Sequence, residues 1–122
     1  MKTNNEFEKV KKSCIDYYDN NHNDYFEKYS DELDKKPYDK DFLTRFASLL
    51  ENNAKILDIG CCSTAQQARF FKDNGYNVTS IDLSKNCIET AKRYFSGINF
   101  IQMDMLEMNF DNDSFTEWRK QF

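Results

Sequence analysis

The chain has 122 residues, a formal net charge of −4 at neutral pH and a sequence pI near 5.0. A chain of this length forms one domain with one core. Its acidity excludes the basic surface that nucleic acid and anionic membranes select, and so favours a small-molecule partner. The four cysteines lack the repeated C-x-x-C spacing of a zinc site, which predicts free thiols and no bound metal.

The first twelve residues are charged and polar, without the apolar core that a signal peptide needs. No stretch approaches the roughly 20 apolar residues of a membrane span. We therefore expect a cytoplasmic protein that has no membrane contact.

Residues 1–53 are patterned as helices. Apolar residues recur at helical spacing on both sides of a polar break at 20–24, first at Phe7, Val10, Cys14 and Tyr17 or Tyr18, then at Phe26, Tyr29 and Leu33. Pro37 is expected to end any helix, and the acidic residues at 39 and 41 to begin a third. The sequence thus predicts a helical region over 1–53.

From residue 54 onward, strand and helix patterns alternate. Strands are predicted at 56–59, 77–83 and 98–103, with a helix at 65–74 closed by Gly75 and another between the cap Ser84 and Gly97. This alternation predicts an α/β fold with right-handed crossovers and a parallel sheet over 54–122.

Each predicted strand ends at an acidic residue, namely Asp58, Asp82 and Asp104. The carboxyl ends of parallel strands share one edge, where ligands bind. Carboxylates at that edge can accept hydrogen bonds from a ribose diol or an amine. Alternatively, they cap the helices that follow, which is the favoured interpretation for Asp104 alone.

The turn after the first strand begins Asp58-Ile59-Gly60-Cys61, as in a loop that brings the backbone against a nucleotide-like cofactor. Such loops usually carry more glycine, because glycine reaches positive φ easily and lets a ligand touch the main chain. Cys62 and Thr64 stand where further glycines are expected. Cofactor binding is therefore predicted together with an obstacle to it.

Four ordered segments, at 56–63, 78–84, 100–105 and 110–115, resemble the motifs of class I S-adenosylmethionine-dependent methyltransferases. The helical region is similar to the lid of the small-molecule branch, near the tellurite-resistance and ubiquinone-type enzymes. The resemblance implies a Rossmann-like sheet of strand order 3-2-1, in which 54–122 is a cofactor-binding half-sheet and a short fourth strand beside the first is left open. It also implies S-adenosylmethionine as cofactor and a small-molecule methyl acceptor. It assigns the cofactor to Asp58, Gly60 and Cys61 in the turn, Asp82 and Leu83 at the ribose, and Asp104 and Met105 at the adenine.

The resemblance names no catalytic residue. His22 could be a base from the lid, although a surface histidine in a polar loop is the favoured interpretation. The family sheet has seven strands whereas this chain stops at Phe122, so a truncated or frame-altered protein is expected, and a non-catalytic binding module is the alternative function. Nicotinamide dinucleotide binding needs G-x-G-x-x-G and is disfavoured, as is a redox or metal pair at Cys61 and Cys62.

If the second neighbour of the first strand is missing, an apolar central strand is left at an edge. Aromatic residues gather in the same C-terminal region: Phe110, Phe115, Trp118 and Phe122. We therefore expect a homodimer through the exposed sheet edge, or poor solubility.

Overall fold

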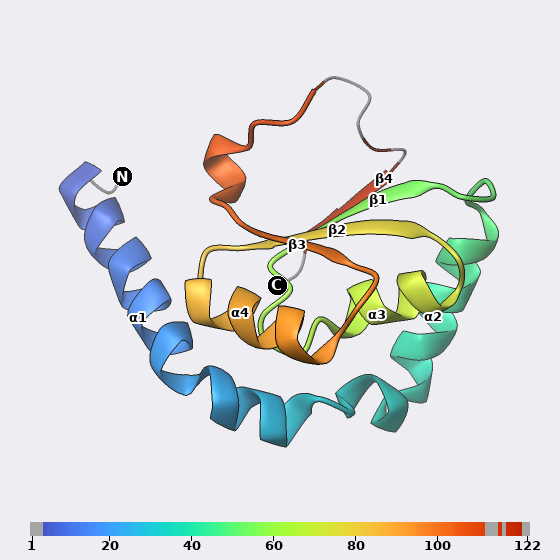
Figure 1. Ribbon diagram of the computed structural model, residues 1–122, viewed down its shortest axis with the longest axis horizontal. Helices are drawn as coiled ribbons and strands as arrows, with labels where there is room; N and C mark the ends of the chain where they lie inside the picture. The colour runs from blue at the N-terminus through green and yellow to red at the C-terminus, as the bar shows by residue number, and fades with distance from the viewer. Residues whose placement is uncertain (1–3, 112–114, 116, 121–122) are drawn as a thin grey trace.

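The computed structural model describes residues 4–111, 115 and 117–120 (Figure 1). Three helical segments come first: α1 (Asn4–Tyr29), the 3-10 helix η1 (Glu32–Lys35) and α2 (Pro37–Ser48). The alternating part then follows as β1 (Lys55–Ile59), α3 (Gln66–Asp73), β2 (Asn77–Asp82), α4 (Lys85–Tyr94), β3 (Asn99–Gln102), the 3-10 helix η2 (Met105–Glu107) and β4 (Glu117–Lys120).

All four strands run parallel in the order β3-β2-β1-β4. Ile59 lies opposite Ile81 of β2 and opposite Lys120 of β4, so β1 has a neighbour on each side. The Rossmann-like order 3-2-1 is confirmed, and the fourth strand that the sequence left open is present. The expectation that β1 is an edge strand is wrong, because β4 supplies the partner for its backbone groups.

The helical region differs from its prediction in two places. The polar residues 20–24 do not break α1, since Asn21 Nδ2 donates to the Tyr17 carbonyl (2.7 Å) and His22 Nδ1 bonds Thr90 Oγ1 of α4 (2.6 Å). Packing of this segment on α4 has overridden its weak local helix propensity. The helix before Pro37 ends at Lys35, as predicted, but α2 begins at Pro37 itself rather than at the acidic residues 39 and 41, because the missing N–H of proline costs nothing at the first helical position.

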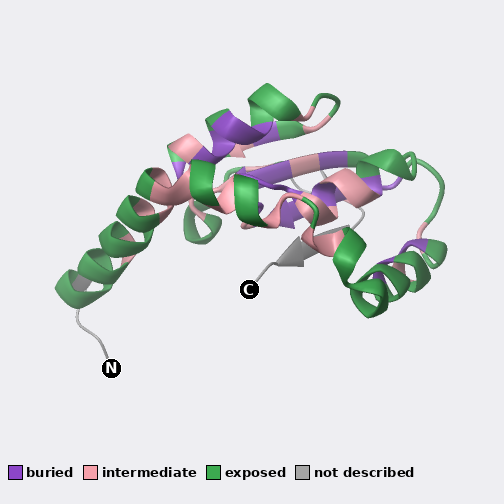
Figure 2. Cartoon of the chain, turned by 90° about the horizontal axis from the view of Figure 1, so that it is seen from below, coloured by how far each residue is buried: buried purple, intermediate pink, exposed green. Residues whose placement is uncertain are grey.

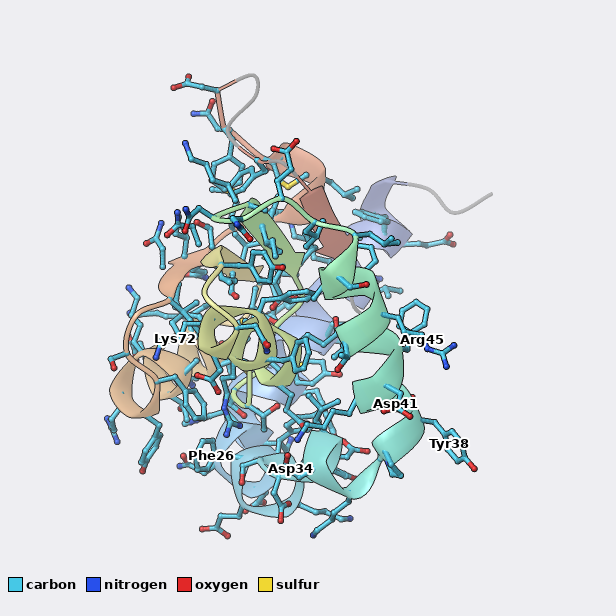
Figure 3. All side chains as sticks on the ribbon, turned by 90° about the vertical axis from the view of Figure 1, so that its right-hand side faces the viewer. Phe26, Asp34, Tyr38, Asp41, Arg45 and Lys72 are labelled. Carbon is cyan, nitrogen blue, oxygen red and sulfur yellow. The ribbon has the colours of Figure 1, made fainter. Side chains whose placement is uncertain are left out.

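One face of the sheet packs against the helices, as Figure 1 shows with α2, α3 and α4 on the same side. The main core joins Ile56 and Val78 of the sheet to Phe71 of α3 and Ala91 of α4. On α2, by contrast, Tyr38 and Arg45 point away from the molecule (Figure 3), and Tyr38 is 87% exposed. The apolar stripe of each helix therefore faces the sheet.

The other face of the sheet is covered by the segment that follows β3. Leu57, Ile59 and Ile81 are buried there, and Phe110 and Phe115 pack against them with ring centroids 5.0 Å apart at 89°. The sequence-based expectation that these two rings add exposed aromatic surface is wrong, since both are half-buried. The side chain of Trp118 and residue Phe122, which shared that expectation, lie outside the described residues.

Candidate cofactor site

The carboxyl ends of β1, β2 and β3 open into a cavity of about 280 Å³, here called the first cavity. Its floor is the turn after β1 together with the ends of β2 and β3, and its wall is the first half of α1. The lining residues are Phe7, Val10, Lys11, Cys14, Ile15, Tyr18, Ile59, Gly60, Ile81, Asp82, Leu83, Ser84, Met103, Asp104, Met105 and Leu106. Most of these side chains are apolar, and two carboxylates stand among them.

The wall exists because α1 is amphipathic along its first four turns. Phe7, Val10, Cys14 and Tyr18 recur every three or four residues and line the cavity from one face of the helix. Figure 1 shows this half of α1 passing the end of the sheet where β2 leads into α4. The opposite face of this half is largely exposed (Figure 2).

The second half of α1 is held on α4. The Asp19 carboxylate accepts hydrogen bonds from Ser84 Oγ and from the Asn86 backbone N–H (3.1 Å), at the start of α4. Asn86 Nδ2 returns a bond to the Asp19 carbonyl (2.9 Å). Ser84 is the N-cap predicted from the sequence, and its Oγ accepts from the Cys87 N–H. Asp19 thus adds a negative charge where the helix dipole favours one.

His22 lies inside α1 and not in a polar loop, so the favoured sequence interpretation was wrong about its setting. Its ring bonds Thr90 Oγ1, and its carbonyl accepts from Ser63 Oγ (2.9 Å) in the turn after β1. His22 is not among the residues that line the first cavity. Its contacts join α1 to the sheet, which is a positioning role.

The turn after β1 keeps a glycine-like backbone without the glycines. Gly60, Cys62 and Ala65 have φ values of +82°, +54° and +44°. Cys62 therefore occupies one expected glycine position in the left-handed region, whereas the next left-handed residue is Ala65 and not Thr64. The Cys62 N–H donates to Asp82 Oδ2 (2.9 Å), and the Gly60 N–H donates to the Ile81 carbonyl (2.8 Å).

Asp82 is the carboxylate at the end of β2. Its Oδ2 accepts from the Cys62 N–H and its Oδ1 from the Ser84 N–H (2.9 Å), so it ties the turn after β1 to the start of α4. Burial raises the pKa of Asp82, and the backbone donors at Ser84 and Cys62 oppose that shift. Each carboxylate oxygen retains capacity for another donor.

Asp104 follows β3 and does two things at once. Its Oδ1 accepts from the Leu106 N–H (2.9 Å) and caps η2, as the favoured interpretation of this residue expected. Its Oδ2 pairs with Lys11 Nζ of α1 at 2.7 Å. The hydrogen bond from Lys11, with that from Leu106, lowers the pKa of Asp104. Asp104 is thus both a cap and a lining residue of the first cavity.

The sequence-based site residues divide into two groups. Gly60, Asp82, Leu83, Asp104 and Met105 all line the first cavity. Asp58 and Cys61 do not.

Asp58 is 1% exposed within β1, and its carboxylate accepts from Ser80 Oγ of β2 (3.2 Å). Its side chain is therefore buried within the sheet and does not reach the first cavity. Cys61 is 1% exposed and borders another cavity. Sequence reasoning missed Lys11, because only the folded chain brings it to Asp104.

That other cavity, of about 310 Å³, lies on the far side of Cys62 and is here called the second cavity. Tyr25, Cys61, Cys62 and Gln66 are among its lining residues. Burial raises the pKa of the Cys62 thiol to about 12, and Asp82 adds to the shift. Burial also raises the pKa of Cys61 well above its usual value. Both thiols are protonated at neutral pH, which disfavours thiolate chemistry there.

Replacing Cys62 by glycine tests two effects of this side chain, namely the backbone strain at its positive φ and the obstruction of ligand binding. Relief of the left-handed strain favours the variant by about 1–2 kcal/mol, and the added freedom of the unfolded chain opposes it by about 0.4–1 kcal/mol. We expect Cys62→Gly to change the free energy of unfolding by less than ~2 kcal/mol while tightening binding of the cofactor implied by the resemblance several-fold. Urea unfolding and calorimetry measure the two quantities. Weaker binding would mean that the turn has adapted to cysteine.

Comparison with protein families matches residues 56–117 to a family described as a methyltransferase domain. The match spans just over half of the chain and contains β1, β2 and β3 with both carboxylates of the first cavity. The chain therefore belongs to the methyltransferase domain family. A comparison with curated proteins gives no match.

Solved structures share the fold, two of them of S-adenosylmethionine-dependent methyltransferases. A TehB-like S-adenosylmethionine-dependent methyltransferase from Corynebacterium glutamicum is 18% identical, with a TM-score of 0.58 over 77% of this chain and 55% of that chain. An S-adenosylmethionine-dependent methyltransferase from Methanosarcina mazei is 25% identical, with a TM-score of 0.54 over 60% of this chain and 39% of that chain. The YcgJ protein from Bacillus subtilis is 19% identical, with a TM-score of 0.59 over 69% of this chain and 38% of that chain. The chain thus matches 38–55% of the length of these structures.

Proposed function

We propose that the chain binds S-adenosylmethionine in the first cavity and transfers its methyl group to a small-molecule acceptor. The observation that carries the proposal is the position of this cavity, at the carboxyl ends of three parallel strands in a chain of the methyltransferase domain family. Ligands of open α/β sheets bind at that edge.

The residues of the first cavity fit the nucleoside part of this cofactor. Apolar side chains from α1 and from Met103 and Leu106 offer two walls to a planar base. Asp82 stands at the end of β2 with capacity left on its carboxylate for a ribose diol, and Asp104 at the end of β3 with an oxygen that faces α1. We assign the adenine to Asp104 and Met105, and the ribose to Asp82 and Leu83.

The bound cofactor supplies an electrophilic methyl group on a sulfonium. The chain positions the reactants and excludes water, which is most of what an in-line methyl transfer requires. In this proposal the first half of α1 covers the nucleoside, while Gly60 and Cys62 shape the passage toward the second cavity. A general base is optional, and we assign none.

A small-molecule acceptor and a cytoplasmic location are also part of the proposal. The net charge of −4 disfavours nucleic acid as the acceptor. Within the described residues, the helices include none with the length and apolar character of a membrane span. Placement in the tellurite-resistance branch and truncation of the chain stay predictions.

A non-catalytic binding module is the second candidate, and the turn after β1 favours it. Cys62 places a Cβ and a half-buried thiol where a glycine would leave space for the methionine portion of the cofactor. Such a chain would still hold the nucleoside, because Asp82 and Asp104 lie in the other direction along the strand ends.

Calorimetric titration with S-adenosylmethionine and S-adenosylhomocysteine tests both candidates. The active-enzyme proposal expects saturable 1:1 binding of each, and formation of S-adenosylhomocysteine when the protein is incubated with S-adenosylmethionine and a deproteinised small-molecule extract. The control is heat-denatured protein. Binding without product formation favours the binding module. Absence of binding to either nucleoside contradicts both.

For assembly we propose a homodimer through the edge of the sheet at β4, which is the outer strand on that side among the described residues. An edge strand presents unpaired backbone groups to another chain. Sedimentation is expected to show a dimer at high micromolar concentration. A Lys120→Pro variant, which removes one backbone donor of β4, is expected to shift the equilibrium toward monomer. A monomeric parent chain at this concentration would contradict the proposal.

A further inference from the structure

The first half of α1 leaves apolar surface uncovered over the first cavity. Phe7 and Val10 line the cavity and are 44% and 45% exposed. The second half of α1 is anchored on α4 by Asp19 and His22, so the two halves differ in how they are held. Half-exposed apolar side chains on a cavity wall gain burial when a ligand fills the space.

An ion pair ties that loosely covered half to the sheet. Lys11 Nζ lies 2.7 Å from Asp104 Oδ2, and the two side chains are only 23% and 15% exposed. The other oxygen of Asp104 accepts from the Leu106 N–H. Lys11 therefore occupies the carboxylate oxygen of Asp104 that faces α1 and the cavity.

We propose that the Lys11–Asp104 pair is an autoinhibitory latch, in which Lys11 competes with the nucleoside for the Asp104 carboxylate and holds α1 over the first cavity. This inference rests on the proposed function, because it takes a nucleoside as the ligand. An amino group that bonds Asp104 from the cavity competes with Lys11 for this oxygen. Partly exposed ion pairs are weak, so the latch opens readily and lowers affinity by about two- to fivefold.

The opposite role for Lys11 is a clasp that helps the lid to close over a bound ligand. The two roles differ in sign. Removing a competitor frees Asp104 and tightens binding, whereas removing a clasp loosens the lid and weakens binding. The ratio of the dissociation constants of the Lys11 variant and the parent chain therefore distinguishes the two roles.

The experiment compares Lys11→Met with Lys12→Met, titrated with S-adenosylhomocysteine by calorimetry. Methionine keeps an unbranched apolar stem and removes the charge. Lys12 is exposed on the same helix and is not a lining residue, so its variant reproduces the charge change. S-adenosylhomocysteine has no net charge, which limits long-range electrostatic effects. The latch predicts about two- to fivefold tighter binding for Lys11→Met and no change for Lys12→Met.

Equal or weaker binding by Lys11→Met, beside a binding parent chain, overturns the latch and leaves the proposed function intact. Absence of binding by the parent and the variant overturns the proposed function and the latch with it. Hydrogen exchange without ligand gives an independent readout. Lys11→Met is expected to speed exchange in the first half of α1 relative to Lys12→Met, with Lys11→Gln acting alike. Unchanged exchange would show that the Lys11–Asp104 pair does not hold the first half of α1 in place, and would overturn the latch.

Discussion

Asp82→Ala is expected to weaken S-adenosylhomocysteine binding by about 1–3 kcal/mol, or roughly 5- to 150-fold. The variant loses the acceptor proposed for the ribose diol. It also leaves the N–H groups of Cys62 and Ser84 without the carboxylate that holds the turn after β1. Calorimetry measures the affinity, with Asp73→Ala as a control because Asp73 is an exposed carboxylate of α3.

The pH dependence of binding gives a second test of Asp82. Burial raises the pKa of this carboxyl, so it takes up a proton at a higher pH than an exposed aspartate does. The protonated form has lost acceptor capacity, and affinity is therefore expected to fall as pH decreases through that raised pKa. Asp82→Asn should flatten the profile. An Asp82→Ala affinity equal to that of the parent chain would contradict the proposed role.

Phe71→Ala is expected to destabilise the fold by about 3–5 kcal/mol, a large part of the ~5–15 kcal/mol that a domain of this kind has. Phe71 is 1% exposed on α3, and its ring lies 5.5–6.1 Å from those of Phe46, Phe70 and Tyr76, measured between centroids. The substitution removes this contact and leaves a cavity between α2, α3 and the sheet.

Urea unfolding followed by circular dichroism measures the loss. Tyr38→Ala is the matched control, since Tyr38 is an aromatic residue that is 87% exposed and points away from α2 (Figure 3). Its variant is expected to stay within about 0.5 kcal/mol of the parent. A Phe71→Ala variant within ~1 kcal/mol of the parent would show that this ring cluster does not anchor the core.

The alternating half of the chain was predictable because its signals are local. The cap at Ser84 and the glycine after α3 were found at their predicted places, and the run 56–59 lies within β1. Each depends on neighbours within a few residues, such as the bond from the Cys87 N–H to Ser84 Oγ. The parallel sheet followed from the alternation itself, and the strand order from the resemblance to the methyltransferase motifs.

The parts that sequence reasoning missed depend on contacts between distant residues. The polar run at 20–24 predicts a break in the helix, because the sequence does not reveal the bond between His22 and Thr90. Lys11 and Asp104 are 93 positions apart, and no periodicity connects them. The conformation of Cys62 could be anticipated from the family pattern, but the use of its N–H by Asp82 could not.

The central claim is that a nucleoside binds between the strand ends and α1, and an NMR titration of the ¹⁵N-labelled chain with S-adenosylhomocysteine tests it most directly. The predicted result is saturable shift changes at the amides of Gly60, Leu83 and Met105 and along the first half of α1. The amides of Gly75 and Asn99, at the opposite end of the sheet, are expected to stay unchanged. No saturable change, or changes confined to the second cavity at Gln66 and Gln67, would contradict the claim.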